Sequence, residues 1–163
     1  MVTESIVFFE DALFASIAAI GFSSISHTPR RAYFICGLAA AVGHSVRFVL
    51  MNSGGEPVNI IVASGIAAFF TGLVAVLFSP LIKVPAEACL IPGLLPMIPG
   101  MYAYRTVAAF AAILASSGED AVMHHIYLLA FNGFTCVAIV VGLVIGGNLP
   151  VFMFKRISFQ ATR

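Results

Sequence analysis

Charged residues are scarce in this chain of 163 residues. They make up 9% of the sequence, whereas hydrophobic residues make up 61% and the mean hydropathy is +1.07. Soluble domains usually contain about 25% charged residues, and a soluble core could not bury this much apolar surface. The length suffices for about five helices of about 20 residues and leaves no room for an additional soluble domain. We therefore expect an all-α integral membrane protein, in which residues 1–163 form a single membrane domain in the lipid bilayer.

Basic clusters and paired cysteines are also missing. The eight lysines and arginines never gather beyond pairs, so nothing suggests a nucleic-acid partner. Cys36, Cys89 and Cys136 are odd in number and lack metal or redox spacing, so we expect neither a metal nor a cofactor. No Ser/His, paired-Asp or metal-ligand pattern points to an enzyme. Residues 1–10 contain no Lys or Arg, which a secretory signal needs, so the first apolar stretch is predicted to be a retained helix.

Polar turns and prolines divide the chain into five predicted helices, at residues 5–24, 32–51, 58–78, 86–115 and 122–147, followed by a short tail. The connections between them alternate in charge. One set contains Arg30, Arg31, Lys83 and the basic tail, whereas the amino terminus, the loop with Glu56 and the loop at 116–120 contain no Lys or Arg. Because Lys and Arg near helix ends stay in the cytoplasm, we expect the amino terminus outside and the carboxyl terminus inside.

Small residues recur at the spacing of helix-packing motifs. Gly142 and Gly146 are four residues apart, as are Ala39 and Gly43. Such pairs allow helix backbones to approach each other closely in lipid. The spacing supports a helix bundle, and it fits packing within the chain and packing against a second chain equally well.

The fourth predicted helix is interrupted by a run of prolines and glycines. Residues 91–100 read I-P-G-L-L-P-M-I-P-G, with Pro92, Gly93, Pro96, Pro99 and Gly100. Proline removes a backbone donor and clashes with the preceding turn, so three prolines in eight positions predict a break between residues 92 and 100. Broken helices form the substrate sites of many secondary transporters, because opened backbone at membrane depth is tolerated where it lines a cavity.

Ionisable side chains inside the first two predicted helices form a candidate cluster. Asp11 and Arg47 lie at a similar depth, roughly 7 to 10 Å from the outer ends of their helices. His44 shares a helix face with Arg47, so the acidic pair Glu10 and Asp11 could balance this basic pair. Two interpretations stay open: a structural ion-pair cluster, and an external gate or proton-linked pair.

Arg105 is the principal candidate for binding substrate. It lies roughly 16 Å from the outer end of the fourth span, near the bilayer midplane, and follows the proline run by little more than one turn. Exposed amides at a helix start attract anions, and arginine binds a carboxylate through two parallel hydrogen bonds. The candidate substrate-binding residues are Arg105, Gly100, Met101, Tyr102, Tyr104, Asn132 and Thr71. The alternatives are an ion pair of Arg105 with an acid of this or another subunit, and bonding of the other polar groups to nearby backbone.

Three segments resemble a known family. They are F-E-D-A-L-F-A-S-I-A-A-I-G-F from Phe9, A-A-V-G-H-S-V-R-F-V-L-M from Ala40, and I-P-G-L-L-P-M-I-P-G-M-Y-A-Y from Ile91. In order, spacing and length the chain resembles the small, YjjB-like subunit of the split threonine/serine exporter family. The resemblance implies a five-helix half-transporter of the bacterial inner membrane, which pairs with a larger YjjP-like subunit and exports succinate or an amino acid by proton antiport. It also implies functional roles for residues 10–11, 43–44, 47 and 92–104, whereas Arg105 departs from the family pattern.

The hypothesis that follows is a secondary exporter of a small carboxylate or a small amino acid such as threonine or serine. Five spans place the termini on opposite sides, and one such unit is too small to enclose a transport pathway. We therefore expect a larger membrane subunit, a homo-oligomer, or both as partners. The alternatives are a homo-oligomeric channel and a scaffold subunit that does not itself transport.

Overall fold

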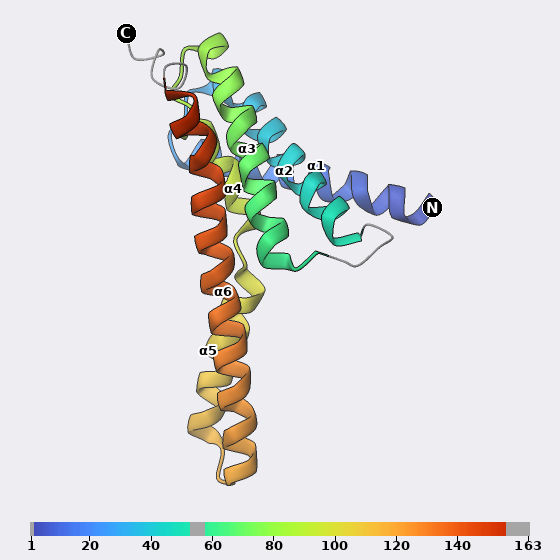
Figure 1. Ribbon diagram of the computed structural model, residues 1–163, viewed down its shortest axis with the longest axis vertical. Coiled ribbons are helices and arrows are strands. Elements are labelled where there is room, and N and C mark those ends of the chain that lie inside the picture. Colours follow the sequence, from blue (N-terminus) through green and yellow to red (C-terminus); the bar gives the residue numbers. More distant parts are fainter. Residues whose placement is uncertain (1, 53–57, 156–163) are drawn as a thin grey trace. The chain divides into compact units, whose positions relative to one another are not determined.

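The structure, a computed structural model, describes residues 2–52 and 58–155, with side chains from Ile6 onward. The elements in these ranges are α1 (Val2–Ile25), η1 (Arg30–Ala32), α2 (Tyr33–Asn52), α3 (Ile60–Ile82), α4 (Glu87–Leu94), η2 (Leu95–Met97), α5 (Gly100–Ala115) and α6 (Glu119–Met153), as Figure 1 shows. All of them are helices, which confirms the all-α prediction. Glu56, Arg156 and Arg163, on which part of the predicted topology depends, lie outside the described residues.

Four of the described helices are long and apolar enough to cross a membrane: α1, α2, α3 and α6. The α4–η2 segment and α5 form a bent pair that adds a fifth span if the two are counted as one. The expected all-α membrane protein is therefore confirmed, whereas the predicted fifth span depends on whether this bent pair is counted as one. The break is narrower than predicted, because only Ile98 and Pro99 lie between η2 and α5.

Two prolines that were expected to interrupt helices lie inside them. Pro80 was predicted to end the third helix, but α3 continues to Ile82. The Val76 carbonyl, which Pro80 cannot bond, instead accepts a hydrogen bond from Ser79 Oγ at 3.0 Å. Pro92 similarly lies within α4, and the thiol of Cys36 donates to the Ala88 carbonyl that Pro92 leaves without its helical partner, at 3.9 Å. Neighbouring side chains therefore compensate for the lost backbone donors.

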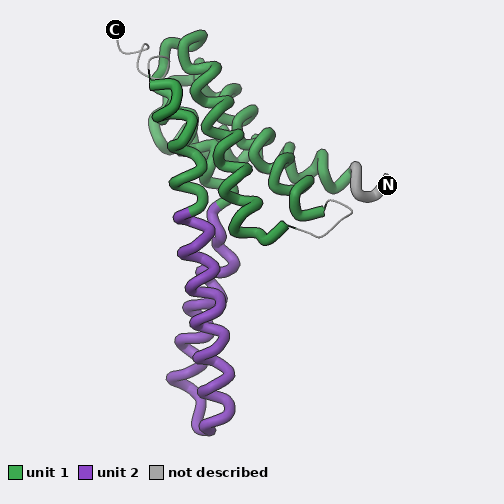
Figure 2. The backbone as a smooth tube through the Cα atoms, in the orientation of Figure 1, with its two compact units in different colours: residues 1–97, 142–163 green, residues 98–141 purple. Residues whose placement is uncertain are grey.

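The chain forms two compact units, which Figure 2 colours separately. Unit 1 comprises residues 1–97 and 142–163, and unit 2 comprises residues 98–141. The long helix α6 contributes to both units. The single membrane domain expected from composition stays a prediction.

Unit 1 is built by close approach of helices at small residues. A Cβ on Gly146 would overlap the Gly65 carbonyl oxygen, and a Cβ on Gly72 would overlap the carbonyl oxygen of Gly147. Backbone therefore lies directly on backbone where α3 crosses the carboxyl-terminal part of α6. The helix α6 does not end near Gly147, as predicted, but extends to Met153 with Pro150 inside it.

Unit 2 is a helical hairpin of α5 and the first part of α6. The Thr106 hydroxyl donates to the Tyr102 carbonyl at 2.8 Å, and the Cys136 thiol donates to the Pro99 carbonyl at 3.9 Å. Most of the large apolar side chains of this hairpin are exposed, among them Tyr104, Val107 and Phe134. Such a surface suits a lipid or protein environment rather than water.

Candidate functional site

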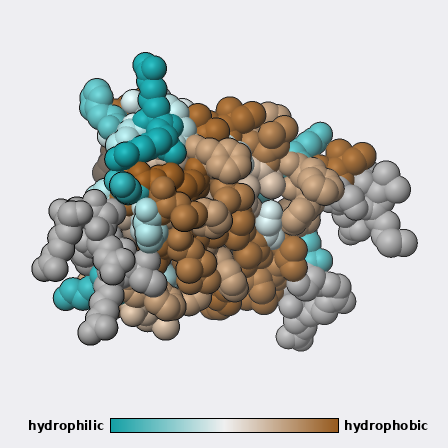
Figure 3. Space-filling model, turned by 90° about the horizontal axis from the view of Figure 1, so that it is seen from above, coloured by the Kyte–Doolittle hydropathy of each residue, from teal (hydrophilic) through white to brown (hydrophobic). Residues whose placement is uncertain are grey.

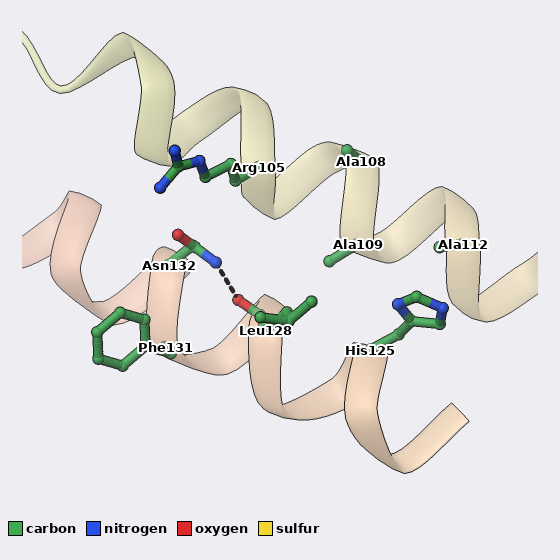
Figure 4. A pocket seen from close by; sticks show the side chains of 8 residues that line it. All are labelled: Arg105, Ala108, Ala109, Ala112, His125, Leu128, Phe131 and Asn132. Atoms are coloured by element: carbon green, nitrogen blue, oxygen red, sulfur yellow. Dashed lines mark hydrogen bonds between the residues drawn. The ribbon is translucent and has the colours of Figure 1, made fainter. Parts of the chain in front are cut away.

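A pocket within unit 2 contains the strongest candidates for ligand binding. Its volume is about 530 Å³, in the range of small-molecule sites. Figure 4 shows the lining residues, which come from α5 and α6: Arg105, Ala108, Ala109, Ala112, His125, Leu128, Phe131 and Asn132. We call this the arginine pocket. Alanines make most of the α5 wall, so the few polar groups stand in an apolar surrounding.

Arg105 and Asn132 offer complementary groups to a ligand in this pocket. Asn132 is 5% exposed, and its Nδ2 donates to the Leu128 carbonyl at 2.7 Å. This bond fixes the amide orientation and leaves Oδ1 as a free acceptor, on the side of the amide toward Arg105 in Figure 4. Among the described residues, the Arg105 guanidinium has no hydrogen-bond or ion-pair partner. A cationic donor and a neutral acceptor therefore line one cavity.

Of the other residues predicted for the substrate site, Asn132 lines the arginine pocket with Arg105, whereas the remaining five do not. Thr71 belongs to unit 1, is fully buried, and donates its hydroxyl to the Ala67 carbonyl at 3.1 Å. Tyr102 is half-buried, whereas Met101 and Tyr104 are 62% and 68% exposed. A Cβ on Gly100 would meet nothing within 4 Å. None of these five residues lines the arginine pocket.

Sequence reasoning missed His125 as part of this pocket. It is half-buried and lies seven residues before Asn132, which places both on one face of α6. Arg105, Ala108, Ala109 and Ala112 follow the same helical spacing on α5. This periodicity was available in the sequence, but only pairing of the two helices makes it informative.

A second polar group lies in unit 1 and joins α1, α2 and η2. His44 Nδ1 lies 3.0 Å from Asp11 Oδ2, and Arg47 Nη2 lies 3.5 Å from the same ring nitrogen. Arg47 Nη1 also donates to the Met97 carbonyl, over 3.5 Å. We call these three side chains the histidine cluster. It brings together the predicted Asp11, His44 and Arg47, and it links them to the last residue before the break.

Glu10 and the second ring nitrogen of His44 take no part in the contacts of the histidine cluster. Glu10 is exposed and has no ion-pair partner among the described residues, because adjacent residues point to different faces of α1. His44 is 6% exposed, and its Nε2 is buried without a hydrogen-bond partner in the described part of the chain. The short Nδ1–carboxylate contact favours a proton on Nδ1 and leaves Nε2 as the acceptor when the ring is neutral. A proton added to the ring would go to this second nitrogen.

Two glycines, Gly43 in α2 and Gly93 in α4, allow both helices to pack closely against Thr71 of α3. A Cβ on Gly43 would overlap Thr71 Oγ1 and lie 2.9 Å from Met97 Cε, while a Cβ on Gly93 would lie 3.0 Å from Thr71 Cγ2. Thr71 is thus a packing residue between three helical segments. Its buried position gives it a structural explanation that needs no substrate.

Comparison with known proteins identifies the family to which the chain belongs. The family described as "Threonine/Serine exporter, ThrE" matches residues 11–153. An uncharacterized protein of Haemophilus influenzae is 31% identical over 140 residues, which cover 85% of this chain and 46% of that protein. The chain therefore spans about half the length of this relative. No solved structure matches this chain. With a match that extends from Asp11, through the histidine cluster and the arginine pocket, to Met153, the chain belongs to the threonine/serine exporter (ThrE) family.

Proposed function

We propose that this chain is one half of a secondary exporter for a small amino acid of the threonine or serine type, and that the arginine pocket binds the substrate. The observation that carries the proposal is that one apolar cavity is lined by both Arg105 and Asn132 Oδ1, neither of which has a partner in the described part of the chain. Arg105 lies about 15 Å along the axis from the end of α5 at Ala115. A cation at such membrane depth needs a partner, and a substrate carboxylate supplies one.

The donors and acceptors of the pocket favour an amino acid over a dicarboxylate. The guanidinium offers paired N–H groups to the substrate carboxylate. Asn132 Oδ1, already fixed by the bond to Leu128, accepts from the ammonium or the hydroxyl group of the same substrate. The second carboxylate of succinate would meet an acceptor oxygen instead of a donor. We therefore prefer threonine or serine to succinate as the transported species.

The histidine cluster is the proposed proton-coupling element. Asp11 and His44 share a short contact, and Arg47 connects them to the carbonyl of Met97 just before the break. Protonation of either partner changes the charge balance of this contact and thereby the interaction of Arg47 with η2. A structural ion-pair role is the alternative. Asp11→Asn that leaves the dependence of export on the proton gradient unchanged would favour the structural role.

The proposed setting is the bacterial inner membrane, with the amino terminus outside. We propose that a larger membrane subunit completes the pathway, consistent with a relative about twice as long as the matched region. In the relative, the unmatched part has the length of a second unit of this size. A homo-oligomeric channel predicts instead that the purified chain alone conducts small anions without a proton gradient.

Export assays with matched variants test the substrate site. Cells expressing the chain together with the proposed larger subunit are loaded with labelled threonine or succinate, and efflux rates are compared. Arg105→Gln and Asn132→Leu should each lower threonine efflux at least about tenfold, which corresponds to about 1.4 kcal/mol of lost binding. Asn148→Leu is the control, because Asn148 makes the same bond to a carbonyl four residues earlier but lies outside the pocket.

Three results would contradict parts of this proposal. If the Arg105 and Asn132 variants exported threonine at the wild-type rate, the arginine pocket would not be part of the transport pathway. If an Arg105 variant and a replacement of the prolines in residues 92–100 both leave efflux intact whenever the complex assembles, the chain acts as a scaffold. A wild-type preference for succinate over threonine would overturn the argument from Asn132.

A further inference from the structure

Four basic side chains gather at one end of unit 1. Arg30 and Arg31 lie in η1, Lys83 follows α3, and Lys155 lies one short turn beyond α6. These residues are exposed, and we call them the basic end. Neighbouring residues bring their backbones together, since Ala32, Val84 and Val151 belong to one buried hydrophobic cluster. The basic end is therefore a single surface and not four separate charges.

One hydrogen bond orders the centre of this surface. Arg31 Nη2 donates to the Lys83 carbonyl at 2.9 Å. Lys83 itself has a left-handed backbone, with φ of 51°, and the Val84 amide donates back to the Ser79 carbonyl at 3.3 Å. This arrangement closes α3 in a defined turn. As a result, the guanidinium of Arg31 is held beside Lys83, whose side chain carries a second positive charge.

Within the described part of the chain, the positive charge at the basic end is largely uncompensated. Glu87, in the first turn of α4, is the acidic residue near this surface in the described part of the chain. No ion pair joins Glu87 to any of the four basic side chains among the described residues. The remaining N–H donors of Arg31, and the side chains of Arg30 and Lys83, likewise have no acceptor there. An anion that reaches this surface meets several free donors.

Exposed apolar side chains lie two or three residues along the chain from three of these basic residues. Phe34, Leu81 and Phe152 are 77%, 75% and 71% exposed, and each lies within one helical turn of a residue in the buried cluster. Figure 3 looks onto this end of the molecule, with hydrophilic side chains at its margin and hydrophobic side chains over the adjoining surface. A free phosphate ion would use only the donors. A phospholipid would use the donors for its headgroup and the apolar side chains for its acyl chains.

We propose that the basic end binds the phosphate group of an anionic phospholipid, with the acyl chains along the apolar side chains beside it. Basic residues at a membrane surface each strengthen binding of anionic lipid roughly fivefold, so loss of three should weaken it roughly 100-fold. The site is separate from the arginine pocket and does not depend on which substrate is exported. It ties the end of α3 and the start of α2 to the lipid surface.

Native mass spectrometry of the purified full chain tests this proposal. The protein in neutral detergent is titrated with phosphatidylglycerol or phosphatidylcholine, and lipid-bound species are counted. We expect at least tenfold preference for phosphatidylglycerol, lost in the triple variant Arg30→Gln, Arg31→Gln, Lys83→Gln. The double variant Arg30→Gln, Lys83→Gln keeps the Arg31 bond to the Lys83 carbonyl and should still lose most of the preference, which guards against misfolding.

The control is Glu87→Gln, which removes the acid at the same end and should maintain or increase binding. Equal retention of both lipids by the wild-type chain would overturn the proposal, as would an unchanged preference in the triple variant. Displacement of phosphatidylglycerol by millimolar inorganic phosphate alone would identify a site for a free anion instead and would also refute the lipid assignment.

Discussion

The crossing of α3 with α6 predicts opposite effects for two glycines only four residues apart. An alanine Cβ at Gly146 would overlap the Gly65 carbonyl oxygen and lie 3.2 Å from the Ala68 Cβ. An alanine Cβ at Gly142 would lie 3.4 Å from the Ile61 carbonyl oxygen and 3.8 Å from the Gly65 Cα, which are acceptable contacts. Gly146→Ala therefore forces the helices apart, whereas Gly142→Ala fits the existing space.

The expected change in the free energy of unfolding combines two opposing effects of the added methyl group. Overpacking a close contact costs about 1 to 3 kcal/mol, and here the obstacle is backbone, which cannot rotate away. Alanine in place of glycine inside a helix returns at most about 1 kcal/mol. We expect the free energy of unfolding to fall by about 1 to 3 kcal/mol for Gly146→Ala. For Gly142→Ala it should stay equal or rise by up to about 1 kcal/mol.

Reversible unfolding in mixed detergent micelles, followed by circular dichroism, measures both variants under one set of conditions. The informative quantity is the difference between the two alanine variants, since both gain the same helix propensity. A difference below about 0.5 kcal/mol would refute the reasoning, because it would mean that the helices do not meet at Gly65 as described.

Two further predictions concern local bonds in unit 1. Ser79→Ala should lower the free energy of unfolding by about 1 to 3 kcal/mol, because the Val76 carbonyl then has no donor. A second change, Pro80→Ala, should restore most of this loss by supplying a backbone N–H, and an equal loss in the double variant would contradict that account. Asp11→Ala and His44→Ala should be non-additive in a double-mutant cycle, with a coupling of at least about 0.5 kcal/mol from their 3.0 Å contact. Additive effects in the same unfolding assay would exclude a direct interaction between these side chains.

The candidate site was partly predictable from single residues. Arg105 and Asn132 stood out because polar side chains are rare in such apolar helices, and the pocket contains both. Thr71 stood out for the same reason, yet the structure gives it a packing role beside Gly43 and Gly93. Polarity alone could not separate these cases, because the distinction depends on which helix faces meet.

The sequence by itself determined the class of protein and the approximate positions of its helices. Its low charge, long apolar stretches and interrupted fourth span are local properties, and each can be interpreted without knowing the neighbours of a residue. Only the tertiary structure decided that Ser79 and Cys36 compensate for Pro80 and Pro92, and that Arg47 reaches the Met97 carbonyl. The bonds from Cys36 and Arg47 join residues about 50 positions apart, and Ser79 acts only because its hydroxyl takes the rotamer that reaches Val76. The bonds from Cys36 and Arg47 follow from how helices pack in three dimensions, which the pattern along one helix does not specify, whereas the Ser79 bond is a choice of rotamer within α3.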